Sequence, residues 1–167
     1  MTIVLRILRL IALSAWVGSL IFFGFVAKIA FTTLPNAHEA GLFVRGSLIE
    51  LHHLGLIAGL IYFLVTLAIL ATQSDTHPAR AAELALIIAM LGLTVYSQYS
   101  IIPRMESDRL ALNGDVTTVS LDNPTRAHFE RLHKLSVQME GAVLIEGLLL
   151  LVLAPIHGRD DFDRFAA

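Results

Sequence analysis

Four long runs of apolar residues, separated by polar segments, dominate the chain. The runs lie at about 4–31, 48–72, 81–102 and 137–156, and they predict membrane-crossing helices at about 4–31, 48–72, 81–112 and 124–156. A hydrocarbon core about 30 Å thick is crossed by about 20 residues that each rise 1.5 Å, and every run reaches that length. The predicted fold is therefore all-α: an integral membrane, antiparallel four-helix bundle, formed by one domain over residues 1–167.

The three connections between these helices differ in length. The first runs from about Thr32 to Arg45 and the second from Gln73 to Pro78, so each predicts a pair of antiparallel neighbours. The third, from Pro103 to about Lys134, is long and mixes acidic with basic residues, as functional connections often do. Within it, Asn123 followed by Pro124 predicts a helix N-cap and the first helical residue.

Composition supports a membrane protein and removes several function classes. Hydrophobic residues make up 56% of the chain, charged residues 16%, and the mean hydropathy is +0.72. The net charge of -2 comes with no basic stripe, so we expect no nucleic-acid partner. The absence of cysteine excludes disulfides, thiolate catalysis and Cys-ligated metals. No hydrolase or transferase motif is present, so a stand-alone enzyme is not predicted, whereas a redox role remains open.

The predicted location is a membrane crossed several times, and we expect the bacterial inner membrane. The first apolar run is longer than the core of a signal peptide, which predicts a retained helix. An even number of helices places both termini on one side. Basic residues are more frequent in the first and third connections than on the side of the termini, which favours a cytoplasmic location for those two connections.

Polar residues inside the apolar runs are the candidate functional residues, because each costs about 2.5–3.5 kcal/mol to insert into a membrane. Antiparallel packing brings most of them to one end of the bundle. His52 shares a helix face with Gly55 and Gly59, so we expect it to point into the bundle, where the glycines allow close packing. The candidates are Glu50, His52, His53, Gln98, Ser136, Glu140 and Glu146, with His133 just before the fourth run.

These residues allow several chemical interpretations. His52 or His53 together with His133 would hold haem b through two axial imidazoles, or copper with Met139 as a further ligand. Arg104 could bind a haem propionate. Alternatively, the histidines hydrogen-bond to Glu50, Glu140 or lipid headgroups and bind no cofactor. A third possibility is an ion path lined by Gln98, Glu140 and Glu146, of which Glu146 is the deepest carboxylate and needs a partner or a proton.

Two sequence segments resemble a known family. They are Tyr99-Ser-Ile-Ile-Pro-Arg-Met105, and His128-Phe-Glu-Arg-Leu-His-Lys-Leu-Ser136, together with a small-residue first helix that contains Trp16. The pattern resembles the four-helix membrane family typified by transmembrane protein 205. That family is distantly similar to copper-resistance domains of the CopD type and to haem-binding protoporphyrinogen oxidases of the HemJ type. The resemblance implies a metal or porphyrin site near paired histidines.

The leading sequence-based hypothesis is a small membrane protein that binds haem or a transition metal between its second and fourth helices, for electron transfer or metal handling. The alternative is a non-catalytic accessory or scaffold subunit without a cofactor, which packs in the lipid bilayer beside a larger membrane complex or in a homo-oligomer.

Overall fold

The computed structural model describes residues 2–72 and 78–166, and their side chains over 3–71 and 80–154. All regular structure in these residues is helical, which confirms the all-α prediction. Four stretches are long and apolar enough to cross a membrane. The elements are α1 (Thr2–Thr33), α2 (Ala37–Thr72), α3 (Pro78–Tyr96), the π-helix η1 (Ser97–Ile101), α4 (Ile102–Ala111), the 3-10 helix η2 (Val116–Thr118) and α5 (Pro124–Ala166).

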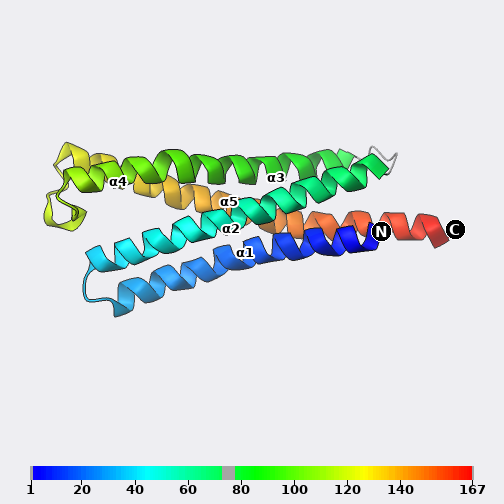
Figure 1. Cartoon of the computed structure of the whole chain (residues 1–167), viewed down its shortest axis with the longest axis horizontal. Helices are drawn as coiled ribbons and strands as arrows, with labels where there is room; N and C mark the ends of the chain where they lie inside the picture. Colours follow the sequence, from blue (N-terminus) through cyan, green and yellow to red (C-terminus); the bar gives the residue numbers. More distant parts are fainter. Residues whose placement is uncertain (1, 73–77, 167) are drawn as a thin grey trace.

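The helices form an elongated antiparallel bundle (Figure 1). The packed pairs are α1 with α2, α2 with α3, α3 with α5, and α5 with α1, so α2 and α5 lie diagonally across the centre. The start of α1 and the end of α5 lie at one end of the bundle, and α4 with the connection to α5 lies at the other. We call these the terminal end and the loop end. The predicted second connection, 73–77, lies outside the described residues.

Helix boundaries at the loop end differ from the sequence-based ones. The second helix begins at Ala37 rather than near residue 48, because polar positions such as Glu39 and Arg45 continue the helix beyond the apolar run. The fourth helix begins at Pro124, as predicted. Asn123 Oδ1 accepts hydrogen bonds from the backbone N–H groups of Thr125 (2.9 Å) and Arg126 (3.2 Å), which confirms the N-cap.

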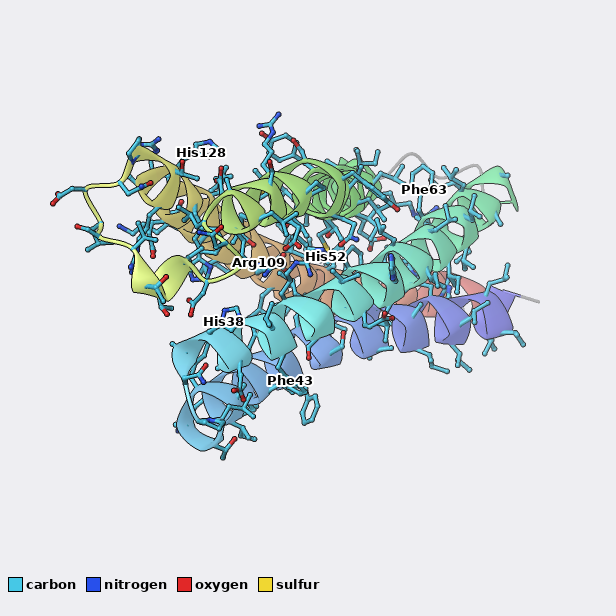
Figure 2. The ribbon with its side chains drawn as sticks, turned by 60° about the vertical axis from the view of Figure 1, so that its left-hand side comes forward. His38, Phe43, His52, Phe63, Arg109 and His128 are labelled. Atoms are coloured by element: carbon cyan, nitrogen blue, oxygen red, sulfur yellow. The ribbon has the colours of Figure 1, made fainter. Side chains whose placement is uncertain are left out.

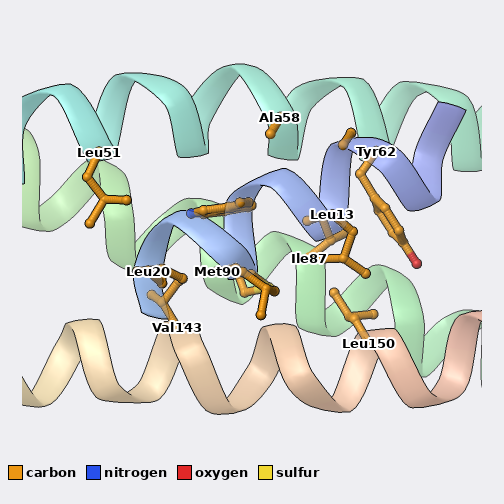
Figure 3. Close-up of a cluster of buried hydrophobic side chains, with 12 residues drawn as sticks. Leu13, Leu20, Leu51, Ala58, Tyr62, Ile87, Met90, Val143 and Leu150 are labelled. Atoms are coloured by element: carbon orange, nitrogen blue, oxygen red, sulfur yellow. The ribbon is translucent and has the colours of Figure 1, made fainter. Parts of the chain in front are cut away.

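The apolar core is centred on Trp16, which is 1% exposed. A Cβ atom added to Gly55 would lie 2.3 Å from its Nε1, and one added to Gly59 would lie 2.5 Å from its Cζ3. The two glycines therefore seat the indole of α1 directly on α2, and the predicted internal packing is confirmed. Figure 3 shows the surrounding side chains that fill the bundle, including Leu13, Ile87, Met90, Val143 and Leu150.

The third membrane span is not one regular α-helix. At its middle, the Ile102 N–H donates to the carbonyl of Ser97, five residues earlier, which is the π-helical pattern. Pro103 explains this change, because proline has no N–H to donate to the carbonyl of Tyr99 and its ring would clash with that carbonyl in an α-helix. The wider turn lets the chain continue into α4, so Pro103 does not end the helix.

Candidate functional site

A buried histidine lies at the centre of the bundle, near the loop end (Figure 2). His52 of α2 is 1% exposed. Its Nε2 lies 2.6 Å from Glu140 Oε1 of α5, and its Nδ1 lies 2.8 Å from Gln98 Oε1 of η1. Three helices thus contribute one side chain each to what we call the His52 cluster: His52, Gln98 and Glu140.

Gln98 can either accept a hydrogen bond from His52 or donate one to it, whereas a carboxylate can only accept. With Oε1 toward the ring, Nδ1–H donates to Gln98 and Nε2–H donates to Glu140, which suits a charged imidazolium. If the amide turns by 180°, its N–H donates to Nδ1 and suits a neutral imidazole instead. The same three residues therefore satisfy both protonation states of His52 without any other rearrangement.

The local structure explains how each member is positioned. Gly55 and Gly59 bring α2 close to Trp16, which turns the face that carries His52 inward. The π-helical turn η1 carries Gln98 beside the buried residues Ser97 and Ile101. Such turns occur frequently at functional sites, because they change which side chains face the interior.

Of the three histidines predicted as haem or metal ligands, the structure places only His52 inside the bundle. The side chain of His53 is 48% exposed and lies 3.9 Å from Glu50, whose side chain is 82% exposed. His133 is exposed and stacks on Phe129, with ring centroids 6.4 Å apart.

The remaining predicted residues are dispersed around the bundle. Met139 is 6% exposed and packs in an apolar cluster with Ile101 and Leu132. Arg104 is exposed on α4. Ser136 is 4% exposed and lies one turn before Glu140 on α5, whereas Glu146 is partly buried. Within the described part of the chain, no group of three or more His, Cys, Asp or Glu side chains is placed to hold a metal ion.

Sequence reasoning missed a second buried ionic group, at the terminal end. Arg9 of α1 is 7% exposed and donates from Nη1 to Glu83 Oε2 of α3 at 2.9 Å. It also donates from Nη2 to the carbonyl of Ala154 on α5 at 3.3 Å. Its guanidinium carbon lies 5.4 Å from the ring centroid of Tyr62 on α2. This Arg9 cluster joins all four membrane spans. The sequence offered one sign of this cluster: Arg9 and Glu83 carry opposite charges, and each lies near the N-terminal end of its own apolar run.

The loop end is held together by a third, more exposed set of polar contacts. Arg109 pairs with Glu106 at 2.6 Å, and Arg45 of α2 approaches the same carboxylate at 3.4 Å. His128 Nδ1 lies 2.6 Å from Asp108 Oδ2, which joins α5 to α4. Figure 2 shows Arg109 and His128 at this end of the molecule.

The connection itself is anchored by Asp115. The hydroxyl and the backbone N–H of Thr117 both donate to this carboxylate, and they hold the pKa of Asp115 below its usual value. His38 of α2 approaches the same side chain at 3.6 Å. These contacts fix the position of the connection over α2.

Comparison with known families gives one match, over residues 11–110, to a domain of unknown function, DUF4149. The chain belongs to the DUF4149 family. The DUF4149 segment contains His52 and Gln98 but ends before Glu140, so the family pattern covers two of the three residues of the His52 cluster. No curated protein and no solved structure matches the chain. This small, multi-pass membrane protein is therefore assigned to a family without an assigned activity, and no named relative supports the resemblance to transmembrane protein 205, CopD or HemJ.

Proposed function

We propose that the chain is a membrane proton-exchange protein, in which His52 takes up and releases a proton between Glu140 and Gln98. The observation that carries the proposal is the position of the imidazole between a carboxylate oxygen at 2.6 Å and an amide at 2.8 Å. Imidazole is the one side chain whose charge ordinarily changes between about pH 5 and pH 8. An ionisable side chain inside a membrane is a functional candidate by default, because burying it is costly.

The chemistry of the exchange follows from the two partners. When His52 is charged, Glu140 compensates the charge and the Gln98 carbonyl accepts the Nδ1 proton. When that proton leaves, the Gln98 amide turns and donates to the free Nδ1. A residue that served only to lock the bundle would not need a partner that fits both states.

We place the route for the proton on the loop-end side of His52. Along α5, exposed His133, buried Ser136 and the 15%-exposed carboxylate of Glu140 follow one another at helical spacing toward the cluster. In the opposite direction lies the apolar packing around Trp16. By the count of basic residues, the loop end faces the cytoplasm, in our proposal that of a bacterial inner membrane.

The haem or copper hypothesis stays a prediction, and the geometry favours it less than proton exchange. Both ring nitrogens of His52 are hydrogen-bonded to protein groups, so a metal would have to displace Glu140 from Nε2. His53 and His133 would have to supply further ligands from exposed positions. The metal or porphyrin site implied by the CopD and HemJ resemblance would require the same rearrangement. An absorption spectrum of the purified protein with added haem or copper tests whether either binds.

The test of proton exchange is a pH titration of the imidazole ¹⁵N signals of the histidine-labelled protein in nanodiscs. The His52→Gln variant assigns the buried signals, and His53→Gln assigns those of an exposed histidine one residue away as a reference. We expect the His52 nitrogens to titrate reversibly between about pH 5 and pH 8. Signals of His52 that stay constant from about pH 5 to pH 8 would refute the proposal and favour the accessory-subunit alternative, in which the cluster only fixes the bundle.

A further inference from the structure

A single carboxylate lies in the apolar middle of the bundle, away from both ionic clusters. Glu146 of α5 is partly buried, and its Oε2 atom is buried with no hydrogen-bond partner. On the helix it shares a stripe with Met139, Val143 and Leu150, which are 6%, 2% and 0% exposed. Its side chain therefore starts on the face of α5 that packs into the core.

Along the membrane, Glu146 lies between the two ionic clusters. At a rise of 1.5 Å per residue, Glu146 lies about 9 Å beyond Glu140 and about 12 Å before the Ala154 carbonyl that binds Arg9. It lies beside Gly147, where an added Cβ would be 2.6 Å from Val17 of α1. The backbones of α1 and α5 are thus close at this level, which excludes water from between them.

Among the described residues, the helices around Glu146 offer it no counter-ion. The helices packed against α5 carry no charged residue or histidine over 10–27 of α1 or 84–96 of α3, and neither does 54–71 of the diagonal helix α2. Toward the terminal end, the first charges beyond these stretches are Arg9 of α1 and Glu83 of α3, which pair with each other, and Arg6 and Arg80 lie farther out. Within α5, residues 141–145 and 147–154 are uncharged.

We infer that Glu146 is a second proton-binding site, occupied by a proton at neutral pH, so that a neutral carboxylic acid lies in the middle of the membrane. A buried carboxylate without a cation or hydrogen-bond donors takes up a proton, because the neutral acid costs far less to hold in an apolar medium. The site goes beyond the proposed function, because it requires neither His52 nor Gln98.

This state gives Glu146 a specific reactivity toward apolar carbodiimides such as dicyclohexylcarbodiimide. The carboxyl proton moves to one nitrogen of the reagent, and the carboxyl oxygen bonds to its central carbon. The acyl group then shifts to the nitrogen and leaves a stable N-acylurea, with no other reactant and no leaving group. Ionised carboxylates in ion pairs lack the proton for the first step, which separates Glu146 from Glu83 and Glu140.

The experiment treats the full-length protein in nanodiscs with dicyclohexylcarbodiimide at neutral pH and locates the adduct by mass spectrometry of peptides. We expect one adduct, at Glu146, formed more slowly as the pH rises. The Glu146→Gln variant should lose it, and the Glu140→Gln variant should keep it. An adduct at Glu140 or Glu83 but not at Glu146 would overturn the inference.

An infrared measurement covers the case in which the reagent fails to reach the site. The carbonyl stretch of a protonated carboxyl group should be present in the wild-type protein at neutral pH and absent in Glu146→Gln. Its absence from the wild type would overturn the inference whatever the labelling result. The ¹⁵N titration of His52 in Glu146→Gln should match that of the wild type, so this test and that of the proposed function fail independently.

Discussion

The two buried ionic clusters of this bundle use the same kind of carboxylate with two different cations. At the terminal end, Arg9 binds Glu83 and a helix carbonyl, and its face lies over Tyr62. At the loop end, His52 binds Glu140 and Gln98. A guanidinium does not lose its proton in proteins, whereas an imidazole does so near neutral pH. In the proposed function, the Arg9 cluster is therefore a permanent link between helices, whereas the His52 cluster changes its charge.

The surroundings of the clusters agree with this difference. The Arg9 cluster joins all four spans and includes a fixed backbone carbonyl, which can only accept a hydrogen bond. The His52 cluster includes a side-chain amide, which can accept or donate. Between them lies the apolar packing of Trp16 and Met90, which keeps the two charges apart.

The largest expected effect comes from breaking the permanent link. Arg9→Met leaves the buried Glu83 without its guanidinium partner, and loss of one member of a buried pair typically costs about 3–5 kcal/mol. Reversible unfolding in mixed detergent micelles measures this loss. The double variant Arg9→Met with Glu83→Met should recover most of it, because neither member of the pair is then buried without the other. A single variant as stable as the wild type would show that Arg9 is not a link.

Changes in the apolar spacer between the clusters are expected to cost less than the loss of Arg9. Gly55→Ala places a methyl group against the Trp16 ring, and such overpacking costs about 1–3 kcal/mol. Gly18→Ala is the matched control on α1, because a Cβ at Gly18 meets nothing within 4 Å. Unfolding measurements should separate the two variants clearly. Equal stabilities would mean that Trp16 does not pack against α2 as described.

Removal of the charge from the exchangeable cluster is expected to cost less than the loss of Arg9. Glu140→Gln keeps an oxygen near His52 Nε2 but removes the carboxylate, and hydrogen bonds to charged groups contribute about 1.5–3 kcal/mol. Glu50→Gln makes the same change at an 82%-exposed side chain, where we expect a change within about 0.5 kcal/mol. If both variants unfold alike, Glu140 does not stabilise the bundle through His52.

The smallest expected change in stability comes from replacing Gln98. Gln98→Leu removes a neutral hydrogen bond, at a cost of about 0.5–1.5 kcal/mol. It should also leave His52 Nδ1 without a hydrogen-bond partner in either protonation state, whereas Gln98→Glu keeps an acceptor for Nδ1–H and supplies no donor for a neutral ring. ¹⁵N spectra of both variants detect these changes at Nδ1. An Nδ1 signal that is unchanged in Gln98→Leu would contradict the hydrogen bond between His52 and Gln98.

The apolar pattern predicted the fold well, because membrane insertion requires long apolar helices and leaves few alternatives. The inward direction of His52 and the N-cap at Asn123 were also predictable, since both follow from local helix geometry. The π-helical turn was not predicted, although Pro103 gave a signal for it: a proline inside a long apolar run requires that one backbone hydrogen bond be missing.

The partners of the buried charges were much harder to predict. Periodicity placed Gln98 and Glu140 at the correct end of the bundle, but which of the nearby histidines they would bind depends on how α2 and α5 rotate about their axes. The Arg9 cluster was not predicted for a similar reason. Arg9 and Glu83 each lie near the start of an apolar run, far apart in the sequence, and only the tertiary packing brings them together in the core.

Counting exchangeable protons tests the difference between the two clusters most directly. Potentiometric titration of the wild-type protein and of His52→Gln in identical nanodiscs should differ by about one proton between about pH 5 and pH 8. His53→Gln removes an exposed histidine one residue away and serves as the control for the loss of one imidazole. Superimposable curves for the wild type and His52→Gln would contradict the account, because His52 would then be as permanent in its charge as Arg9.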